Sequence, residues 1–284
     1  MAISFSSLGD PAPIGNLLIV DGLNIAFRWK HQGVTDFKYD YARTVESLAK
    51  SYNAGTIIIT ADGGSSYRKA IHPEYKANRK EKYAEQTEQE AKEFAMFMAE
   101  FSNTLTLLKE KHTVLQFKGV EADDIAAYIS MNLEKFNFDE CWMVSSDRDW
   151  DLLITDKVSR FSTVTRKEVT LDTWDEHYDF EVEDYITFKC LTGDKGDNVP
   201  GIPGIGPKRA VDLMQQYGSV FDIYDSIPID GKYKYIQSLN ENAEQLLINV
   251  ELMDLVTYSE EAIGKDNIET INRKIEERRR NGEN

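Results

Sequence analysis

Four short apolar runs, each followed closely by acidic residues, constrain the fold of this chain more than any other feature of its sequence. The runs occupy residues 17–20, 56–60, 113–117 and 141–144, and helical patterns fill 40–52, 85–111 and 122–133. Strands that are apolar on both faces and alternate with helices are typical of a parallel sheet that is covered on both sides. The sequence therefore predicts an α/β fold with a mostly parallel central sheet and helices on both of its faces.

Acidic residues gather where the predicted strands end. The first two strands lead to Asp21 and Asp62, the third to Glu121, Asp123 and Asp124, and the fourth to Asp147 and Asp149. Ligands of such sheets bind in the crevice beyond the carboxyl ends of the strands. Hard divalent cations prefer oxygen ligands, and a pair of them can clamp a scissile phosphate. We therefore expect a metal-binding pocket there, joined by Asp194 and Asp197 from a Gly-rich turn.

A simpler interpretation applies to some of these residues. A single Asp at the end of a strand is more often a helix cap or a turn former, and we interpret Asp10, Asp36 and Asp172 in this way. Asp123 precedes a helix and could itself be a cap. The three carboxylates between 121 and 124 exceed what capping requires. No histidine lies near them in the sequence and Cys-x-x-Cys is absent, so magnesium or manganese is favoured over zinc.

The charge of the chain is unevenly distributed. Its formal net charge of −16 argues at first sight against a nucleic-acid partner. However, the segment from Tyr67 to Tyr83 contains six basic residues, namely Arg68, Lys69, Lys76, Arg79, Lys80 and Lys82, against Glu74 and Glu81. Cations bound by the clustered carboxylates would also reverse the local sign. Tyr67, Tyr75 and Tyr83 lie among the basic residues, where they either stack on unpaired bases or pack on the helices.

A second basic feature follows a Gly-rich turn at residues 201–210, GIPGIGPKRA. Backbone amides at the start of a helix suit a phosphate, and Lys208 and Arg209 add positive charge. A plain corner between two helices is the alternative. The adjacent Lys-Arg pair favours a hairpin that grips the backbone of DNA without reading its bases.

The organisation of the chain is predicted as follows. Residues 1–16 form a flexible lead-in, 17–180 a catalytic α/β core, and 181–284 a helical subdomain whose charged end, 273–284, frays. No apolar run reaches the roughly 18 residues of a membrane span, and the start of the chain lacks a signal-peptide pattern. Cys141 and Cys190 lie in apolar stretches, which predicts buried free thiols. We expect a cytoplasmic monomer.

Six segments carry a family resemblance when they are taken together. They are Val20-Asp21-Gly22 with Arg28, Asp62-Gly63, Tyr75-Lys76-Ala77-Asn78-Arg79, Glu121-Ala122-Asp123-Asp124, Asp147-Arg148-Asp149, and the run from Gly193 to Arg209. In order and spacing the chain resembles the 5′-nuclease (flap endonuclease) family. It is particularly similar to stand-alone bacteriophage 5′-3′ exonucleases and to the 5′-nuclease domain of bacterial DNA polymerase I.

The resemblance implies roles for individual residues. Asp62, Glu121, Asp123 and Asp124 would serve one metal region, supported by Asp21, and Asp147, Asp149, Asp194 and Asp197 a second, with Mg²⁺ as the ion and Mn²⁺ as a substitute. Residues from about 63 to 111 would form a helical arch for a 5′ single strand, where Lys76 and Arg79 meet the scissile phosphate. A helix-hairpin-helix element at about 193–217 would hold duplex DNA. The DNA contacts would then be Arg28, Lys76, Arg79, Lys82, Gly204, Gly206, Lys208 and Arg209.

Two departures concern this hairpin. Gly196 and Arg209 stand where polymerase-type relatives carry Ser and Thr. The potassium site that the resemblance implies for this element therefore rests on altered residues.

The function expected from the resemblance is that of a structure-specific 5′ nuclease in DNA replication and repair. It would hydrolyse phosphodiester bonds of branched or 5′-ended DNA by a two-metal-ion mechanism, with Lys76, Arg79, Asp123 and Asp147 in the catalytic centre. Two alternatives are an RNA-directed nuclease of the related acidic-pocket type and a catalytically inactive structure-specific DNA-binding protein. The hairpin argues against the first, and the full set of carboxylates argues against the second.

Overall fold

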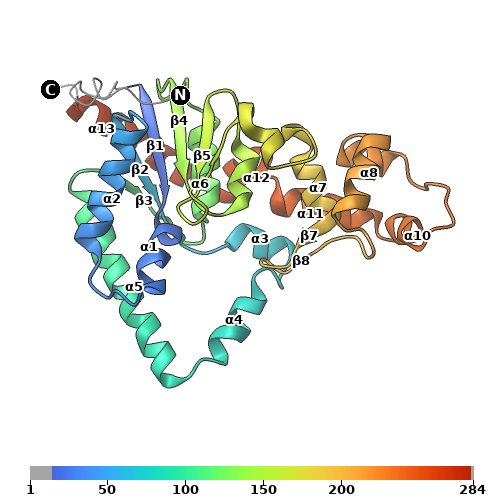
Figure 1. The fold of residues 1–284 in the computed structure, drawn as a ribbon, viewed down its shortest axis with the longest axis horizontal. Coiled ribbons are helices and arrows are strands. Elements are labelled where there is room, and N and C mark those ends of the chain that lie inside the picture. The colour runs from blue at the N-terminus through green and yellow to red at the C-terminus, as the bar shows by residue number, and fades with distance from the viewer. Residues whose placement is uncertain (1–14, 283–284) are drawn as a thin grey trace.

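The computed structural model describes residues 15–282, and a six-stranded sheet of order β3-β2-β1-β4-β5-β6 forms its centre (Figure 1). The strands are β1 (Asn16–Asp21), β2 (Thr56–Thr60), β3 (Thr113–Leu115), β4 (Glu140–Val144), β5 (Val158–Phe161) and β6 (Glu168–Val169). All neighbours pair in parallel except β5 and β6. The predicted mostly parallel sheet is confirmed. Strands β5 and β6 were not predicted, because they are short and carry polar residues.

Alternate residues of β1 face two separate cores, as expected for a strand that is buried on both sides. Leu17 and Ile19 belong to one core, and Leu18 and Val20 belong to the other. The first core includes residues of α6 (Ala122–Ser130), α12 (Leu255–Ile263) and α13 (Lys265–Gly282). The second includes residues of α1 (Gly22–His31), α2 (Lys38–Ser51) and α5 (Glu88–Lys109). Helices therefore cover both faces of the sheet, as predicted.

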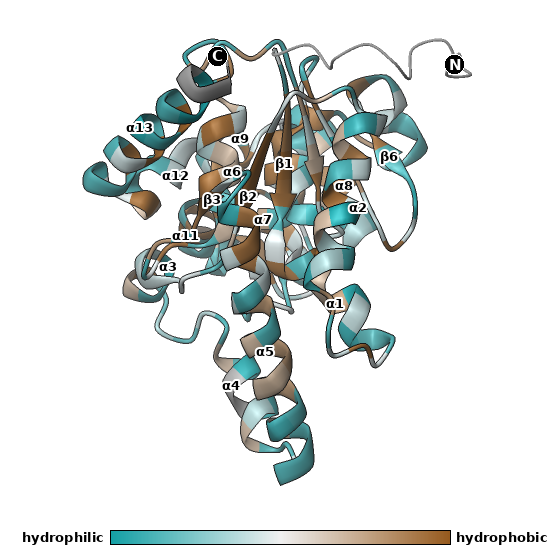
Figure 2. Cartoon of the chain, turned by 90° about the vertical axis from the view of Figure 1, so that its left-hand side faces the viewer, coloured by the Kyte–Doolittle hydropathy of each residue, from teal (hydrophilic) through white to brown (hydrophobic). Residues whose placement is uncertain are grey.

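A helical arch projects from the sheet. Its two arms are α4 (Ala77–Ala84) and α5, and α3 (Ser66–Ile71) lies at its foot (Figure 1). Residues near the tip of the arch are mostly hydrophilic, whereas the strands are hydrophobic (Figure 2). Helix α5 begins at Glu88 because of a reciprocal cap: the Thr87 hydroxyl accepts a hydrogen bond from the backbone N–H of Glu90, and the Glu90 carboxylate accepts one from the backbone N–H of Thr87.

The helical C-terminal part has a core of its own. It is built from α7 (Tyr185–Thr192), α8 (Pro207–Tyr217), α9 (Val220–Asp225), α10 (Lys234–Glu241) and α11 (Ala243–Met253). Two short antiparallel strands, β7 (Gly193–Asp194) and β8 (Val199–Pro200), close a loop between α7 and α8. The sequence predicted no strand in this part. The 3₁₀ helix η2 (Arg148–Leu153) connects β4 to β5, and two further 3₁₀ helices, η3 (Leu171–Glu176) and η4 (Val182–Asp184), link the sheet to α7.

Helix α1 follows β1 without a loop, because it begins at Gly22 and is capped by the Asp21 side chain. The charged end that was expected to fray from residue 273 instead continues α13 to Gly282, and Ile271 and Ile275 of this helix are buried against the sheet core. The predicted lead-in lies outside the described residues except for its last two positions. Within the described chain, every helix is too short or too polar to cross a membrane.

Candidate active site

The site lies at the point where the order of the strands reverses. From β1 the chain adds β2 and β3 on one side of the sheet, and then β4, β5 and β6 on the other side. Strand β1 pairs with β2 on one side and with β4 on the other, so the carboxyl ends of β1 and β4 flank a switch point. Asp21 ends β1, and Ser145, directly after β4, donates a hydrogen bond of 2.6 Å to the Asp21 Oδ2. The next residues lead to Asp147, which caps η2. The two sequence motifs are therefore neighbours in space.

Asp21 is both a helix cap and a buried carboxylate. Its Oδ1 accepts a hydrogen bond of 3.2 Å from the backbone of Asn24. Burial raises the pKa of Asp21 to about 7, although the Ser145 hydroxyl opposes this shift, and the charges of Asp62 and Asp147 raise the pKa further. This pattern shows that three of the predicted metal ligands lie within electrostatic reach of one another.

Asp123 points into the same centre and is not the cap of α6. Its Oδ1 accepts a 2.6 Å hydrogen bond from Trp150 Nε1, whereas the Oδ1 of Asp62 accepts one of 2.9 Å from the backbone of Ala122 in the first turn of α6. Burial raises the pKa of Asp123 well above its usual value, the charges of Asp147, Asp62 and Asp21 add to this effect, and the charge of Lys76 opposes it. We call Asp21, Asp62, Asp123 and Asp147 the central carboxylates. Among the side chains that the structure describes, which leave out those of residues 80, 81 and 280–282, none places a basic nitrogen within 4.0 Å of them.

A buried arginine neutralises two other predicted ligands. Arg68, on α3, is only 3% exposed, and its guanidinium donates to Glu121 at 2.8 Å and to Asp124 at 2.7 and 2.8 Å. Its Nε donates to the backbone oxygen of Leu252 at 2.7 Å, which ties α3 to α11. Burial raises the pKa of Asp124 despite the opposing effect of Arg68.

A buried lysine plays the same part on the other side of the site. Lys189, on α7, forms ion pairs with Asp149 and, at 3.3 Å, with Asp194. Burial raises the pKa of Asp149 to about 6, Lys189 opposes the shift, and the nearby charge of Asp147 supports it. Asp147 therefore stands between the two predicted metal regions.

The foot of the arch brings two further cations to the carboxylates. Lys76 forms ion pairs with Glu121 and, at 3.4 Å, with Asp197, and Arg79 contacts Asp197 at 2.6 Å. Burial alone would raise the pKa of Asp197, but Lys76 and Arg79 hold it below its usual value. We call Glu121, Asp124, Asp149, Asp194 and Asp197 the paired carboxylates, since each has an internal cation.

The tyrosines of the arch take different positions. Tyr75 is buried, and its hydroxyl donates to Asp197 at 2.8 Å and to Glu121 at 3.3 Å, so its role here is packing and positioning. Tyr67 donates to Glu251 at 3.3 Å. Tyr83 is 50% exposed, with its ring centroid 5.3 Å from that of Phe94. Only Tyr83 of these three therefore offers a broadly exposed ring.

The arrangement has a consequence for metal binding. In the described part of the chain, no three carboxylates converge closely enough to hold an ion as the side chains stand. Arg68, Lys76 and Lys189 occupy the paired carboxylates instead. Sequence reasoning did not identify Arg68 or Lys189 as part of the site. A lysine within the apolar helix YITFKCLT was a signal for Lys189, because a buried lysine requires a partner.

At the hairpin, the two basic residues differ. The Arg209 guanidinium donates to the backbone oxygen of Gly204 at 2.5 Å and lies 4.6 Å from the ring centroid of Tyr235. Gly204 has a φ of +83°, so the arginine braces a turn that favours glycine. Lys208 is exposed, and α8 begins directly after Gly206. Arg28 and Lys82 are exposed as well, on α1 and α4.

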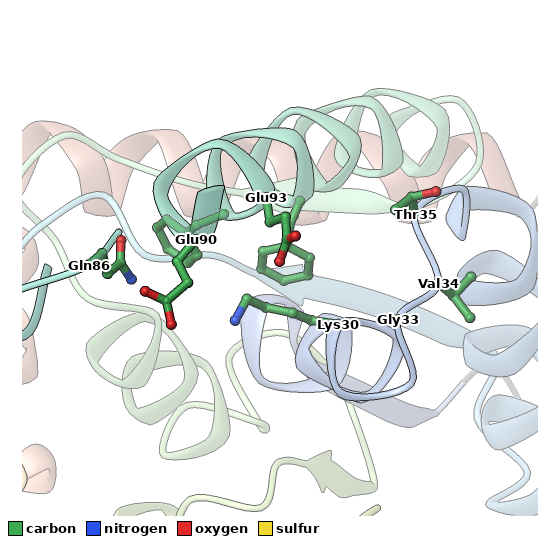
Figure 3. A pocket seen from close by; sticks show the side chains of 9 residues that line it. Lys30, Gly33, Val34, Thr35, Gln86, Glu90 and Glu93 are labelled. Atoms are coloured by element: carbon green, nitrogen blue, oxygen red, sulfur yellow. The ribbon is translucent and has the colours of Figure 1, made fainter. Parts of the chain in front are cut away.

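A separate cavity of about 440 Å³ lies between the end of α1 and the start of α5 (Figure 3). Lys30, Glu90 and Glu93 line it, and the Lys30 amine lies 5.7 Å from the ring centroids of both Phe27 and Phe94. None of the central or paired carboxylates lines this cavity. It is therefore distinct from the candidate active site.

Comparison with known proteins identifies the class. The family described as "5'-3' exonuclease, N-terminal resolvase-like domain" matches residues 16–179, and "5'-3' exonuclease, C-terminal SAM fold" matches residues 180–276. The chain belongs to the 5′-3′ exonuclease family and is a nuclease of the flap endonuclease type.

Individual relatives sharpen this assignment. The chain is 44% identical to the flap endonuclease of Escherichia phage T5 over 92% of its own length and 91% of the relative. It is 30% identical to DNA polymerase I of Bacillus subtilis over 85% of its length and 28% of that protein. Solved structures of the phage T5 enzyme, one with zinc ions and one as a pseudo-enzyme-product complex with DNA and metal ions, match with a TM-score of 0.88 and 43% identity. Each covers 93% of this chain and 99% of the neighbour. The family resemblance inferred from the motifs is confirmed.

Proposed function

We propose that this structure-specific 5′ nuclease hydrolyses phosphodiester bonds of branched or 5′-ended DNA, in replication and repair, with Mg²⁺ as its resident ion. The observation that carries the proposal is the meeting of carboxylates from four strand ends and one loop beneath a basic helical arch. Mn²⁺ would replace Mg²⁺, because both ions take oxygen ligands. The T5 structures with divalent ions and DNA support the same chemistry.

The residues fit divalent ions by their chemistry. The central carboxylates are crowded and form no ion pair within 4.0 Å among the described side chains, and burial together with like charge raises the pKa of Asp21 and Asp123. Such a group is stabilised by any cation that enters it. We assign Asp21, Asp62 and Asp123, with Glu121 and Asp124, to one ion, and Asp147 with Asp149, Asp194 and Asp197 to a second. When bound, the ions would supply an activated water and stabilise the charge on the reacting phosphate.

The side chains of the arch foot complete the catalytic centre. Lys76 and Arg79 now pair with Glu121 and Asp197, so incoming ions and a DNA phosphate would compete for both partners. Released from these pairs, the two cations would hold the scissile phosphate. Trp150 and Tyr75 would keep Asp123 and Asp197 oriented through the hydrogen bonds that they donate.

Contacts to the rest of the DNA would come from surfaces around this centre. Lys208 and the backbone amides near Gly204 and Gly206 would contact duplex phosphates, with Arg209 bracing the turn. Arg28 and Lys82 are exposed and would add contacts on either side of the arch. The potassium site stays a prediction.

We further propose that the protein acts as a monomer in the cytoplasm. The large apolar side chains that are exposed lie on separate segments, for example Tyr39 on α2, Phe221 on α9, and Val164 and Tyr233 in loops. Scattered apolar residues are ordinary surface, whereas stable interfaces present contiguous patches.

The direct test is cleavage of 5′-labelled flap DNA with Mg²⁺, with Mn²⁺ and with a chelator, beside a single-stranded RNA of equal length. The proposal predicts metal-dependent release of products that carry a 5′-phosphate and leave a 3′-hydroxyl, from DNA only. Preferential cleavage of RNA would favour the RNA-directed alternative. Tight flap binding without cleavage under any metal condition would favour an inactive DNA-binding protein.

A further inference from the structure

A set of uncharged hydrogen bonds joins the foot of the arch to the loop between β7 and β8. The backbone N–H of Lys76 donates to the Asp197 carbonyl at 2.8 Å, and the Asn198 amide donates to the Glu74 carbonyl at 2.8 Å. The Asn78 amide donates to the carbonyls of Lys195 and Gly196, at 3.0 and 3.3 Å. We call these contacts the clasp. Its two sides are separated by about a hundred residues of chain, so the contact is purely tertiary.

Both sides of the clasp have an unusual backbone. Lys76 has a φ of +57° and Asn198 a φ of +59°, in the left-handed region that non-glycine residues seldom adopt. Such conformations persist only where surrounding contacts determine them. In addition, the Oδ1 of Asn78 is buried without a hydrogen-bond partner among the described residues, whereas its amide nitrogen donates to two carbonyl oxygens. The contacts of Asn78 in the clasp are therefore made by the donating side of its amide.

The clasp differs in kind from the ion pairs beside it. Lys76 and Arg79 bind Glu121 and Asp197 through charged groups, and these pairs must open if a phosphate and metal ions are to use the same groups. Hydrogen bonds between amides and backbone carbonyls need not change when charges are exchanged nearby. The backbone of the arch foot can therefore stay fixed while its charged side chains change partners.

We propose that Asn78 and Asn198 are positioning residues, which lock the foot of α4 to the loop carrying Asp194 and Asp197. The lock keeps Lys76 and Arg79 in one frame with these carboxylates throughout the reaction. The proposal rests on the nuclease function proposed above and adds residues outside the proposed sets of metal ligands and DNA contacts. A displacement of about 1 Å at a catalytic group can lower a rate roughly a hundredfold, so a loosened clasp is expected to affect turnover strongly.

Two substitutions of Asn198 separate the hydrogen bond from other effects. Asn198→Asp keeps the shape and the left-handed backbone but loses the donor, and Asn198→Gly loses the side chain at a φ that glycine adopts freely. Asn137→Asp is the matched control. Asn137 also has a positive φ, of +56°, but it is exposed and precedes β4, at the end of the sheet opposite to the acidic residues. Asn78→Ala tests the other half of the clasp.

The first readout does not depend on activity. Hydrogen–deuterium exchange at the amides of residues 75–84 should become at least about tenfold faster in Asn198→Asp, Asn198→Gly and Asn78→Ala, and stay unchanged in Asn137→Asp. Unchanged exchange in all three clasp variants would overturn the proposal, whatever their activity.

The second readout is single-turnover cleavage of flap DNA in Mg²⁺. The clasp variants should lose roughly tenfold or more in rate at saturating DNA, with affinity for DNA within about twofold of the original chain. Lys76→Ala should cost less in the Asn198→Gly background than in the original chain, because a displaced Lys76 contributes less. If the original chain cleaves normally and the clasp variants cleave at the same rate, the positioning role of Asn78 and Asn198 is contradicted but the nuclease function is not. Absence of cleavage by the original chain would instead contradict the proposed function.

Discussion

The central and the paired carboxylates lie around the same switch point of the sheet but are stabilised in different ways. Glu121 and Asp124 share the buried Arg68, and Asp149 and Asp194 share the buried Lys189. The central carboxylates have no such partner within the described residues, and two of them have a raised pKa through burial and like charge. Internal cations therefore stabilise the paired carboxylates before any ion binds, whereas the central carboxylates have only ions from solution to stabilise their charge. We expect an ion to enter among the central carboxylates first, and the paired carboxylates to join as ligands when their internal cations are displaced.

The largest expected effect is on the chemistry of the centre. Asp123→Asn should lower the cleavage rate of flap DNA by roughly a thousandfold or more, since each factor of ten corresponds to about 1.4 kcal/mol of transition-state stabilisation. The substituted amide can still accept the hydrogen bond from Trp150, so folding and DNA binding should be nearly normal. Single-turnover assays and circular dichroism would measure both. Asp172→Asn, in the first turn of η3, is the control and should cleave at the original rate. If Asp123→Asn kept more than about a tenth of the original rate, Asp123 would not be a metal ligand and the central carboxylates would lose their separate role.

The next effect concerns the contribution of the paired carboxylates to the stability of the fold, as distinct from their part in catalysis. Arg68→Met removes one partner of a buried ion pair and should lower the free energy of unfolding by about 3–5 kcal/mol. Denaturant unfolding without metal would measure this loss. Arg43→Met, which breaks the exposed Arg43–Asp40 pair, should change stability little. Equal losses in the free energy of unfolding of the two variants would show that Arg68 does not stabilise the fold through Glu121 and Asp124.

A smaller effect is expected at Lys76, which pairs with two of the paired carboxylates and is also assigned to the reacting phosphate. Lys76→Ala should lower the rate at saturating DNA by roughly tenfold to a hundredfold and weaken DNA binding less, because its charge acts on the reacting phosphate. Comparison of single-turnover rate and dissociation constant would show the split. Lys50→Ala, at an exposed position of α2, is the matched control. Equal losses in the two variants would remove Lys76 from the catalytic centre.

The smallest effect concerns the hairpin, which lies outside both carboxylate groups. Lys208→Ala should weaken duplex binding for unrelated sequences alike and reduce the slope of log affinity against log salt by about 0.9. The rate at saturating DNA should stay unchanged. Fluorescence anisotropy at several salt concentrations provides the measurement. A normal slope with a reduced rate would instead place Lys208 in the active centre.

The sequence predicted the parts of this site that have a local signature. Continuous apolar runs indicated β1 to β4, and the acidic residues behind them indicated the crevice, because parallel strands end at one edge. Strand β5 was missed because Arg160 interrupts its apolar pattern, and only the structure shows that Asp151 and the Ser145 carbonyl satisfy this buried arginine. Similarly, the pairing of Arg68 with Asp124 spans 56 positions and leaves no periodic trace. Which carboxylates have an internal cation and which do not could therefore be seen only in the three-dimensional structure.

The most direct test of that division is where the first metal ion binds. Crystals soaked at low Mn²⁺ concentration should show an anomalous peak within coordination distance of Asp21, Asp62, Asp123 or Asp147, with Lys189 still paired to Asp149 and Asp194. A second peak should appear only at higher Mn²⁺, together with movement of Lys189. A first peak at Asp149 and Asp194, with the central carboxylates free of metal, would contradict the account.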